Sequence, residues 1–318
     1  MLTDLMCTLA ETKPALTTSI VVIFIANEEN GVFKGIGVDQ LALEGHLDRL
    51  LPGPVFWVDS ADAQPCIGTA GNLQWKLDIS GKAFHSGLPH KGINAIELGV
   101  DTVAYLQARF FEAFPAHPLE KEYNFATQST FKATRIQSLT GAVNQIPGDC
   151  TIEGDVRLAP FYDVKDVRTL IEATVAEINT NPTILEGLTN HGPHSKYTLP
   201  LENLQGKITL TWLFAGENGV ACKLTSPGHL ALKRATHEVL GTVVPYGIGG
   251  SLPLIRDLQE KGFDVQIAGY GLSSLYHADN ESATLSGMKN ATLIIAKVSV
   301  IISVYMYMLY LLHWYSHA

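Results

Sequence analysis

Residues 73–80 read LQWKLDIS, and apolar and polar side chains alternate along this stretch. Because successive side chains of a strand point to opposite faces of a sheet, the alternation predicts a strand with one buried and one exposed face. From here the sequence predicts strand, helix, strand, strand, helix, strand, which is the order of a ferredoxin-like βαββαβ unit. The expected elements are strands 73–80, 130–137, 150–158 and 207–214 and helices 94–111 and 163–178.

The regions on either side of this unit have an α/β pattern. Residues 19–26, SIVVIFIA, and residues 54–58, PVFWV, are continuous apolar runs. Such runs are typical of strands in a parallel sheet that is covered on both faces. Helices are expected at 4–11, 35–50, 229–240, 252–261 and 283–303, and a further strand is expected at 264–269. The sequence therefore predicts an α/β domain split by an inserted unit, with segments 1–72, 73–222 and 223–318.

Composition limits the classes of function. The 318 residues are 46% hydrophobic and carry a formal net charge of −9. A chain of this kind can bury a core, and its acidity argues against nucleic acid as a partner, because a phosphate backbone needs a basic surface. The four cysteines are far apart and form no Cys-x-x-Cys pair, so neither a thiolate zinc site nor a disulfide framework is indicated.

Carboxylates follow both apolar runs. Glu28 and Glu29 come directly after residues 19–26, and Asp59 comes directly after residues 54–58. In an open parallel sheet, ligands bind outside the carboxyl ends of the strands, so these side chains are expected to converge. One carboxylate can hold a metal while a neighbour handles a proton. The alternative is that each lies on a solvated loop or caps a turn.

Three further stretches carry groups that can do chemistry. His277 lies between the last expected strand and the last expected helix, and imidazole with carboxylates suits zinc, cobalt or manganese. His85 lies in a loop before the helix at 94 and could donate to an oxyanion. The loop 247–251, GIGGS, precedes an expected helix and could bind an anion through backbone N–H groups. Taken singly, each is also compatible with an ordinary turn.

As a set these features resemble one family, the dinuclear zinc deacylases, which include acetylornithine deacetylase, succinyl-diaminopimelate desuccinylase, aminoacylase and carboxypeptidases. The similarity is greatest to plant-type acetylornithine deacetylases and runs from about residue 3 to 296. The residues that carry it are FIANEEN at 24–30, FHSGLPHKGIN at 84–94, NQIP at 144–147, GDVRLAPFYDVK at 154–165, LPLIRDLQEKGFDVQ at 252–266 and Tyr276-His277.

The resemblance implies a fold and an activity. The fold would be a metallopeptidase-like α/β catalytic domain with an inserted dimerisation domain that acts as a lid. The activity would be metal-dependent hydrolysis of the amide bond of N-acetylornithine in arginine and ornithine biosynthesis, giving acetate and the free amine. The implied cofactors are two divalent metal ions, zinc or cobalt.

The resemblance also implies roles for the residues around the metal ions. Glu28 would be the general base that takes a proton from a bridging water. Glu29 would bind one metal ion together with His277, and Asp59 would bind the other. A hydroxide held between two Lewis acids is a nucleophile at neutral pH, which agrees with a hydrolase.

The remaining implied roles concern the substrate. His85, on the inserted domain, would reach into the active site of the partner subunit in a homodimer and stabilise the tetrahedral oxyanion. Asn144 and Arg157 would hold the carboxylate of a small N-acyl amino acid. The loop that lines the same pocket would contribute Gly249, Gly250 and Ser251.

The chain departs from the family pattern at its N-terminal side. Family members carry a His-x-Asp motif and a later bridging Asp before the strand that matches 19–26. The eighteen residues before position 19 contain no His, and their one Asp, Asp4, lies on an expected helix. A catalytic zinc ion usually has three protein ligands. We therefore expect an N-terminally truncated family member with poor metal affinity and little or no hydrolysis by this polypeptide.

Two other readings stay open at this point. The chain could be a non-catalytic, dimerising member of the family, or a deacylase for a different N-acyl amino acid. A cytoplasmic location is expected. The uncharged run 298–312 leaves membrane association as the alternative, although 15 residues are fewer than the roughly 20 that span a bilayer.

Overall fold

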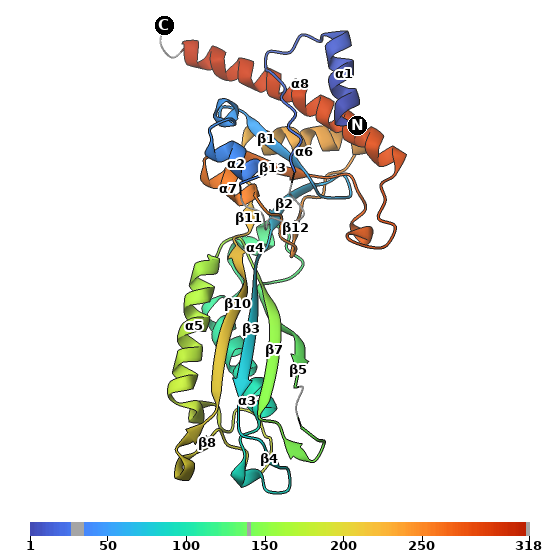
Figure 1. Ribbon diagram of the computed structural model, residues 1–318. Coiled ribbons are helices and arrows are strands. Elements are labelled where there is room, and N and C mark those ends of the chain that lie inside the picture. Colours follow the sequence, from blue (N-terminus) through green and yellow to red (C-terminus); the bar gives the residue numbers. More distant parts are fainter. Residues whose placement is uncertain (27–34, 139–140, 316–318) are drawn as a thin grey trace.

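The computed structural model describes residues 1–26, 35–138 and 141–315, with side chains described as far as residue 304. The molecule is elongated and has two lobes (Figure 1). One lobe contains a five-stranded sheet with parallel and antiparallel pairs, which we call the mixed sheet. The other contains a four-stranded sheet whose pairs are all antiparallel, which we call the antiparallel sheet. The predicted half-exposed sheet of the inserted unit is therefore present, whereas the sheet predicted to be parallel is mixed.

The mixed sheet is centred on two strands. β13 (Asp264–Ala268) pairs in parallel with β1 (Pro54–Val58) and antiparallel with β2 (Pro65–Thr69). Two short strands, β11 (Val220–Ala221) and β12 (Tyr246–Ile248), also pair with β2. Because β1 and β13 are parallel, their carboxyl ends lie at the same edge of the sheet.

Helices cover both faces of the mixed sheet. α2 (Val38–Leu43) and α7 (Ile255–Glu260) pack against one face, where their buried residues form a cluster with Trp57. α6 (Pro227–Leu240) covers the other face, and α8 (Leu285–Tyr315) packs on α6. This double cover explains why the strand at 54–58 is a continuous apolar run.

The antiparallel sheet has the strand order β10-β3-β7-β5, with two helices on one face. This is the order of a ferredoxin-like unit and confirms the βαββαβ prediction. Its elements are β3 (Gly71–Ser80), α3 (Ala95–Ala113), β5 (Thr130–Gln137), β7 (Asp149–Leu158), α5 (Val164–Thr180) and β10 (Lys207–Glu217).

The apolar and polar residues of β3 alternate between a buried and an open face, as the sequence predicts. Its apolar residues face α3 and α5 and are fully buried or nearly so, while the polar residues between them face the open side of the sheet. Asn94 caps α3 through its side-chain oxygen, and Asp163 caps α5 in the same way. These caps fix where each helix begins.

One charged group lies inside this lobe. Asp101, on α3, is only 1% exposed and accepts a hydrogen bond from Tyr197 Oη at 2.5 Å. Its other carboxylate oxygen contacts Thr189 Oγ1 and, at 2.9 Å, His191 Nε2. The buried carboxylate thus has partners for both oxygens, all from the connection that follows α5.

The remaining short elements connect these parts. They are α1 (Leu2–Thr12), η1 (Asp48–Leu50), β4 (Phe84–His85), η2 (Pro89–Lys91), α4 (Pro118–Glu122), β6 (Gln145–Ile146), η3 (Pro182–Leu185), β8 (Thr198–Leu199), η4 (Pro200–Glu202), β9 (Leu204–Gln205) and η5 (Ser273–Leu275).

The predicted strand at 19–26 is wrong. This stretch forms no strand, and none of the described strands pairs with it. Ile25 packs against the cluster of the mixed sheet, but Phe24 is 73% exposed. The composition of the run favours a strand, but a strand also needs a neighbour for its N–H and C=O groups. Both neighbouring positions of β13 are taken, by β1 and β2, and residues 19–26 do not pair with the outer edge of β1, which ends the sheet.

Two helix predictions are too long. The expected helix 35–50 is divided into α2 and η1, because Gly45 has a φ of +77° that no α-helix continues through. The expected helix 252–261 begins only at Ile255, because Leu254 has a φ of +68°. The glycine-rich loop 247–251 therefore does not lead directly into a helix.

The long helix α8 carries an apolar surface. Within the described residues, one helical segment, Leu285–Val304, is long and apolar enough to cross a membrane, and a third of it is buried in the molecule. The buried part includes Ile294, Val298 and Ile301, which pack with α6. A core helix of a soluble protein passes the same test of length and composition.

A buried histidine makes stability depend on pH. His229, on α6, is 5% exposed, and its Nδ1 has no hydrogen-bond partner. Burial lowers its pKa, and Lys233 adds to this, while Gln266 and Asp264 oppose it. The unfolded chain therefore binds a proton at His229 at a higher pH than the folded chain does. The stabilising effect is complete above the unfolded pKa and is lost as the pH falls toward the folded value.

We expect the free energy of unfolding to fall by up to about 1.4 kcal/mol per pH unit from this group below roughly pH 6.5. Urea titrations at pH 7.5, 6.5, 5.5 and 5.0 would measure this. His229→Gln should flatten the profile relative to wild type. His237→Gln, an exposed position on the same helix, is the matched control and should leave it unchanged. Equal profiles for all three proteins would contradict the assignment.

Candidate functional site

The loops after β1 and β13 are joined to each other. The N–H of Asp59 donates to Ala268 O at 2.9 Å, and the N–H of Asp62 donates to Gly271 O at 3.0 Å. Asp62 Oδ1 in turn accepts from the N–H of Ser273 at 3.1 Å. Asp59 and the loop that leads to His277 therefore lie at the same edge of the mixed sheet, where the strand-end argument places them.

His277 occupies an unusual backbone position. It is exposed, follows η5 and has a φ of +52°, which non-glycine residues rarely adopt. Its neighbour Tyr276 interacts with Tyr246, and burial raises the pKa of both phenols. The Oη of Tyr246 also donates to Ala61 O at 3.1 Å. These contacts connect the His277 loop, the loop after β1 and the segment just before residues 247–251.

The described residues do not complete a metal site. In the parts 1–26, 35–138 and 141–315, no group of three or more His, Cys, Asp or Glu side chains is placed to hold a metal ion. Glu28 and Glu29 lie outside the described residues. The predicted donors that are described are Asp59 and His277, which is fewer than the three protein ligands usual for catalytic zinc.

A second group of predicted residues meets at the junction of the two lobes. Arg157 on β7 and Gly249 line the same small cleft, and their companions in its wall are Ala70, Phe125, Thr127, Gln128, Ser129 and Ala159. Gly250 and Ser251 continue the loop from Gly249, and the Ala70 N–H donates to Gly250 O at 2.9 Å. Arg157 Nε donates to Asp155 Oδ2 at 2.8 Å. The structure thus brings Arg157 and the glycine-rich loop together at this junction.

His85 and Asn144 lie elsewhere. β4 pairs with β6, so His85 is opposite Gln145, and the Ser86 N–H donates to Asn144 O at 3.0 Å. In Figure 1 these strands lie at the far tip of the antiparallel lobe, away from the mixed sheet. Within one chain, Asn144 therefore lies with His85 and apart from Arg157. A joint role for Asn144 and Arg157 on one substrate molecule needs a tip from another chain.

The exposed imidazole at this tip has a defined orientation. The Gly87 N–H donates to His85 Nδ1 at 3.0 Å. With Nδ1 as acceptor, the proton of the neutral ring is on Nε2, which can donate outward. This geometry suits a donor to a developing negative charge.

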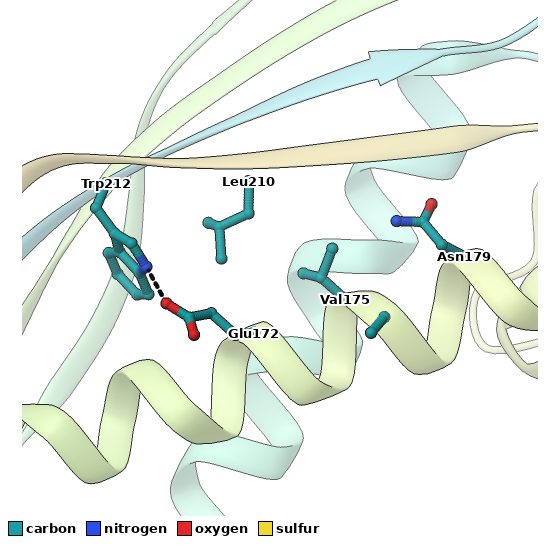
Figure 2. A pocket seen from close by; sticks show the side chains of 6 residues that line it. Glu172, Val175, Asn179, Leu210 and Trp212 are labelled. Atoms are coloured by element: carbon teal, nitrogen blue, oxygen red, sulfur yellow. Dashed lines mark hydrogen bonds between the residues drawn. The ribbon is translucent and has the colours of Figure 1, made fainter.

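A larger hollow of about 310 Å³ lies on the outer side of the antiparallel lobe, between α5 and β10 (Figure 2). Trp212 Nε1 donates to Glu172 Oε1 at 2.8 Å across it, and the other lining residues are Val175, Ala176, Asn179 and Leu210. Its one titratable side chain is already paired, and none of the predicted site residues lines it. The junction is therefore the better candidate for a substrate site.

Sequence reasoning missed Asn72 and Tyr246. Asn72 Nδ2 donates to Ser251 Oγ at 2.8 Å and so joins the start of β3 to the glycine-rich loop. The alternation along 73–80, extended back by one residue, places Asn72 on the open face of the sheet, beside Arg157. That alternation could have identified Asn72 from the sequence. No sequence pattern identified Tyr246, which lies in the short strand β12.

Comparisons with known proteins agree with this architecture. Residues 67–181 match the family model described as peptidase dimerisation domain. Among solved structures, the chain resembles aminopeptidase PepT from Bacillus cereus, with a TM-score of 0.65 and 15% identity over 95% of this chain and 69% of that one. It also resembles human carnosine dipeptidase 1, with a TM-score of 0.54 and 16% identity over 83% and 63% of the two chains. At these identities the likeness concerns the fold alone.

Curated relatives are much more similar. The chain is 53% identical to acetylornithine deacetylase of Arabidopsis thaliana, over 91% of this chain and 64% of the relative. It is 47% identical to acetylornithine deacetylase of Dictyostelium discoideum, over 93% of this chain and 67% of the relative. The chain thus spans about two thirds of the length of these relatives. With this degree of identity along nearly all its residues, the chain belongs to the acetylornithine deacetylase family.

Proposed function

We propose that this chain is an N-acyl amino acid amidohydrolase whose substrate is N-acetylornithine, in the pathway that makes ornithine and arginine. The observation that carries the proposal is the identity of 53% and 47% to two acetylornithine deacetylases. The junction cleft adds support, because Arg157 and the loop that contains Gly249, Gly250 and Ser251 offer a cation and polar groups for a carboxylate.

The family metals fit only in part. The described donors, Asp59 and His277, are at one edge of the mixed sheet, and in the sequence Glu29 is the further donor and Glu28 the candidate base. Two divalent ions, zinc or cobalt, need more protein ligands than these. We therefore propose that the 318-residue polypeptide binds metal weakly and hydrolyses N-acetylornithine slowly or not at all.

We further propose that the chain forms a homodimer through the antiparallel lobe. The match of residues 67–181 to a peptidase dimerisation domain supports this. The position of His85 and Asn144 at the tip supports it as well. His85 lies away from the mixed sheet of its own chain, and in a homodimer its imidazole could donate a hydrogen bond in the active site of the partner. For location we propose the cytoplasm, with membrane association through residues 298–312 as the alternative; part of α8, including Ile294, Val298 and Ile301, packs on α6.

Hydrolysis and ligand stabilisation together test the proposal. Ornithine release by the purified chain should be near background without added metal and low with millimolar Zn²⁺ or Co²⁺. N-acetylornithine should raise the melting temperature more than N-acetylalanine or N-succinyl-diaminopimelate does, because a ligand that binds only the folded chain stabilises it.

Three results would contradict parts of this proposal. Fast hydrolysis with one or two metal ions per chain would contradict the weak metal site. Larger stabilisation by a different N-acyl amino acid would overturn the choice of substrate. Dimers that respond to none of these ligands would favour the non-catalytic alternative.

A further inference from the structure

Asn72 connects the two lobes at the substrate side of the junction. It is the second residue of β3, where the chain enters the antiparallel lobe, and its side chain lies on the open face of that sheet. Its Nδ2 donates to the Oγ of Ser251, which belongs to the loop between β12 and α7, at 2.8 Å. The Oδ1 of Asn72 is buried and has no hydrogen-bond partner. The contact with Ser251 is therefore what orients this amide.

This contact determines what Ser251 can offer. A serine hydroxyl has one proton to donate and accepts through its lone pairs. Because Asn72 Nδ2 is purely a donor, Ser251 Oγ acts as the acceptor here and keeps its own proton for another group. In the parts of the chain that the structure describes, no acceptor takes that proton. Ser251 is thus set as a hydroxyl donor.

Arg157 lies directly beside this arrangement. It is the cross-strand partner of Asn72 in the pairing of β3 with β7, so both side chains are on the same face of the sheet. Asp155 accepts the hydrogen bond from Arg157 Nε, so the terminal nitrogens of the guanidinium can donate to another acceptor. Arg157 also lines the cleft with Gly249, two residues before Ser251. Ser251 therefore lies two residues along the chain from the wall of the cleft that Arg157 lines.

We propose that Asn72 is a positioning residue: by donating to Ser251 Oγ it turns the Ser251 proton toward the α-carboxylate of a bound N-acyl amino acid, which Arg157 also contacts. This rests on the proposed function for the class of ligand. The specific consequence is that the polarity of residue 72, and not only its size, controls affinity for the carboxylate.

Asn72→Asp tests this directly, because it keeps the shape and replaces the donor by an acceptor. An aspartate at this position would take the Ser251 proton for itself and add a negative charge near the ligand. We expect the affinity for N-acetylornithine to fall tenfold to a hundredfold, the range for losing a hydrogen bond to a charged group. Affinity for the carboxamide, N-acetylornithinamide, should change less than threefold. Both dissociation constants are measured by calorimetric or NMR titration of the full chain.

Three further variants make the result specific. Asn72→Ala removes the donor without adding a charge and should also lower affinity for the carboxylate more than for the carboxamide. Ser251→Ala should do the same, and the double variant with Asn72→Ala should be no worse than Ser251→Ala alone. Gln74→Glu, at the next position on the open face of β3, adds the same charge and should leave both affinities within threefold of wild type. Circular dichroism and melting temperature establish that each variant is folded.

Several results would overturn the proposal. These are a wild-type chain with no preference for the carboxylate, an Asn72→Asp variant that binds it as wild type does, equal losses for carboxylate and carboxamide, or losses in Asn72→Ala and Ser251→Ala that simply add. Failure of the proposed function has a different signature. In that case another N-acyl amino acid binds more tightly than N-acetylornithine, while its carboxylate still depends on Asn72.

Discussion

Trp75→Ala should lower the free energy of unfolding by about 3–5 kcal/mol, the usual cost of removing a large aromatic side chain from a core. Trp75 is fully buried on β3 and stacks on Phe131 of β5, with ring centroids 4.8 Å apart and planes inclined by 17°. It also fills the space over Gly154 of β7, where a Cβ would lie 2.3 Å from the indole. Urea denaturation followed by far-ultraviolet circular dichroism measures the loss.

Trp212→Ala is the matched control for this prediction. Trp212 is on β10 of the same sheet but only partly buried, with its Nε1 bonded to Glu172 and Arg168 over its ring at 5.4 Å. Its loss should cost roughly 1 kcal/mol, since the side chain stays in contact with water and its bonds are near the surface. Equal destabilisation by the two variants would mean that the stack of Trp75 on Phe131 is not the centre of this core.

Asp101→Ala should destabilise the antiparallel lobe by roughly 3 kcal/mol, because it leaves one buried and two half-buried donors without this acceptor. Tyr197 Oη, Thr189 Oγ1 and His191 Nε2 all converge on this carboxylate. Burial and the bond to Asp101 raise the pKa of Tyr197, so the phenol stays a donor across the accessible range. The connection after α5 should then open and become sensitive to protease between residues 186 and 197.

Limited proteolysis with mass spectrometry and urea denaturation together test this second prediction. Asp101→Asn should have an intermediate effect, since one amide oxygen still accepts while the new NH₂ meets donors. Glu112→Ala, at an exposed position near the end of the same helix, is the control and should stay within about 0.5 kcal/mol of wild type. Unchanged protease resistance in Asp101→Ala would show that the carboxylate does not hold the connection.

The antiparallel lobe could be predicted from the sequence almost element by element. β3 and β7 alternate strictly between more and less buried residues, the helices start at the Asn94 and Asp163 caps, and both signals are local. The mixed sheet was harder, because a continuous apolar run reports burial but not pairing. The runs 54–58 and 19–26 therefore look alike in the sequence, although 54–58 pairs with β13 and forms a strand and 19–26 does not. The short strands β2, β11 and β12 exist through their pairing with distant residues, which no local pattern contains.

The candidate site shows the same limit. The rule that ligands lie beyond strand ends was enough to place Asp59 near the loop of His277. Sequence spacing could not tell that Asn144 lies with His85 and apart from Arg157, because this depends on how β4 and β6 pair. Asp101 was overlooked because a single acidic residue on a helix usually faces solvent. Its spacing from Leu98 and Thr102, both buried, was the available sign.

The two chain crossings between the lobes lie side by side. Pairing of β3 with β10 extends to Asn72 and Glu217, and a Cβ on Gly71 would lie 2.9 Å from the nitrogen of Gly219. On the other side of this point, β2 and β11 pair antiparallel, with Thr69 opposite Val220. Without residues 71–218, β2 and β11 would be the two arms of a plain β-hairpin. The antiparallel lobe thus occupies the position of a hairpin turn, where a folded unit can be gained or lost without breaking the sheet that receives it.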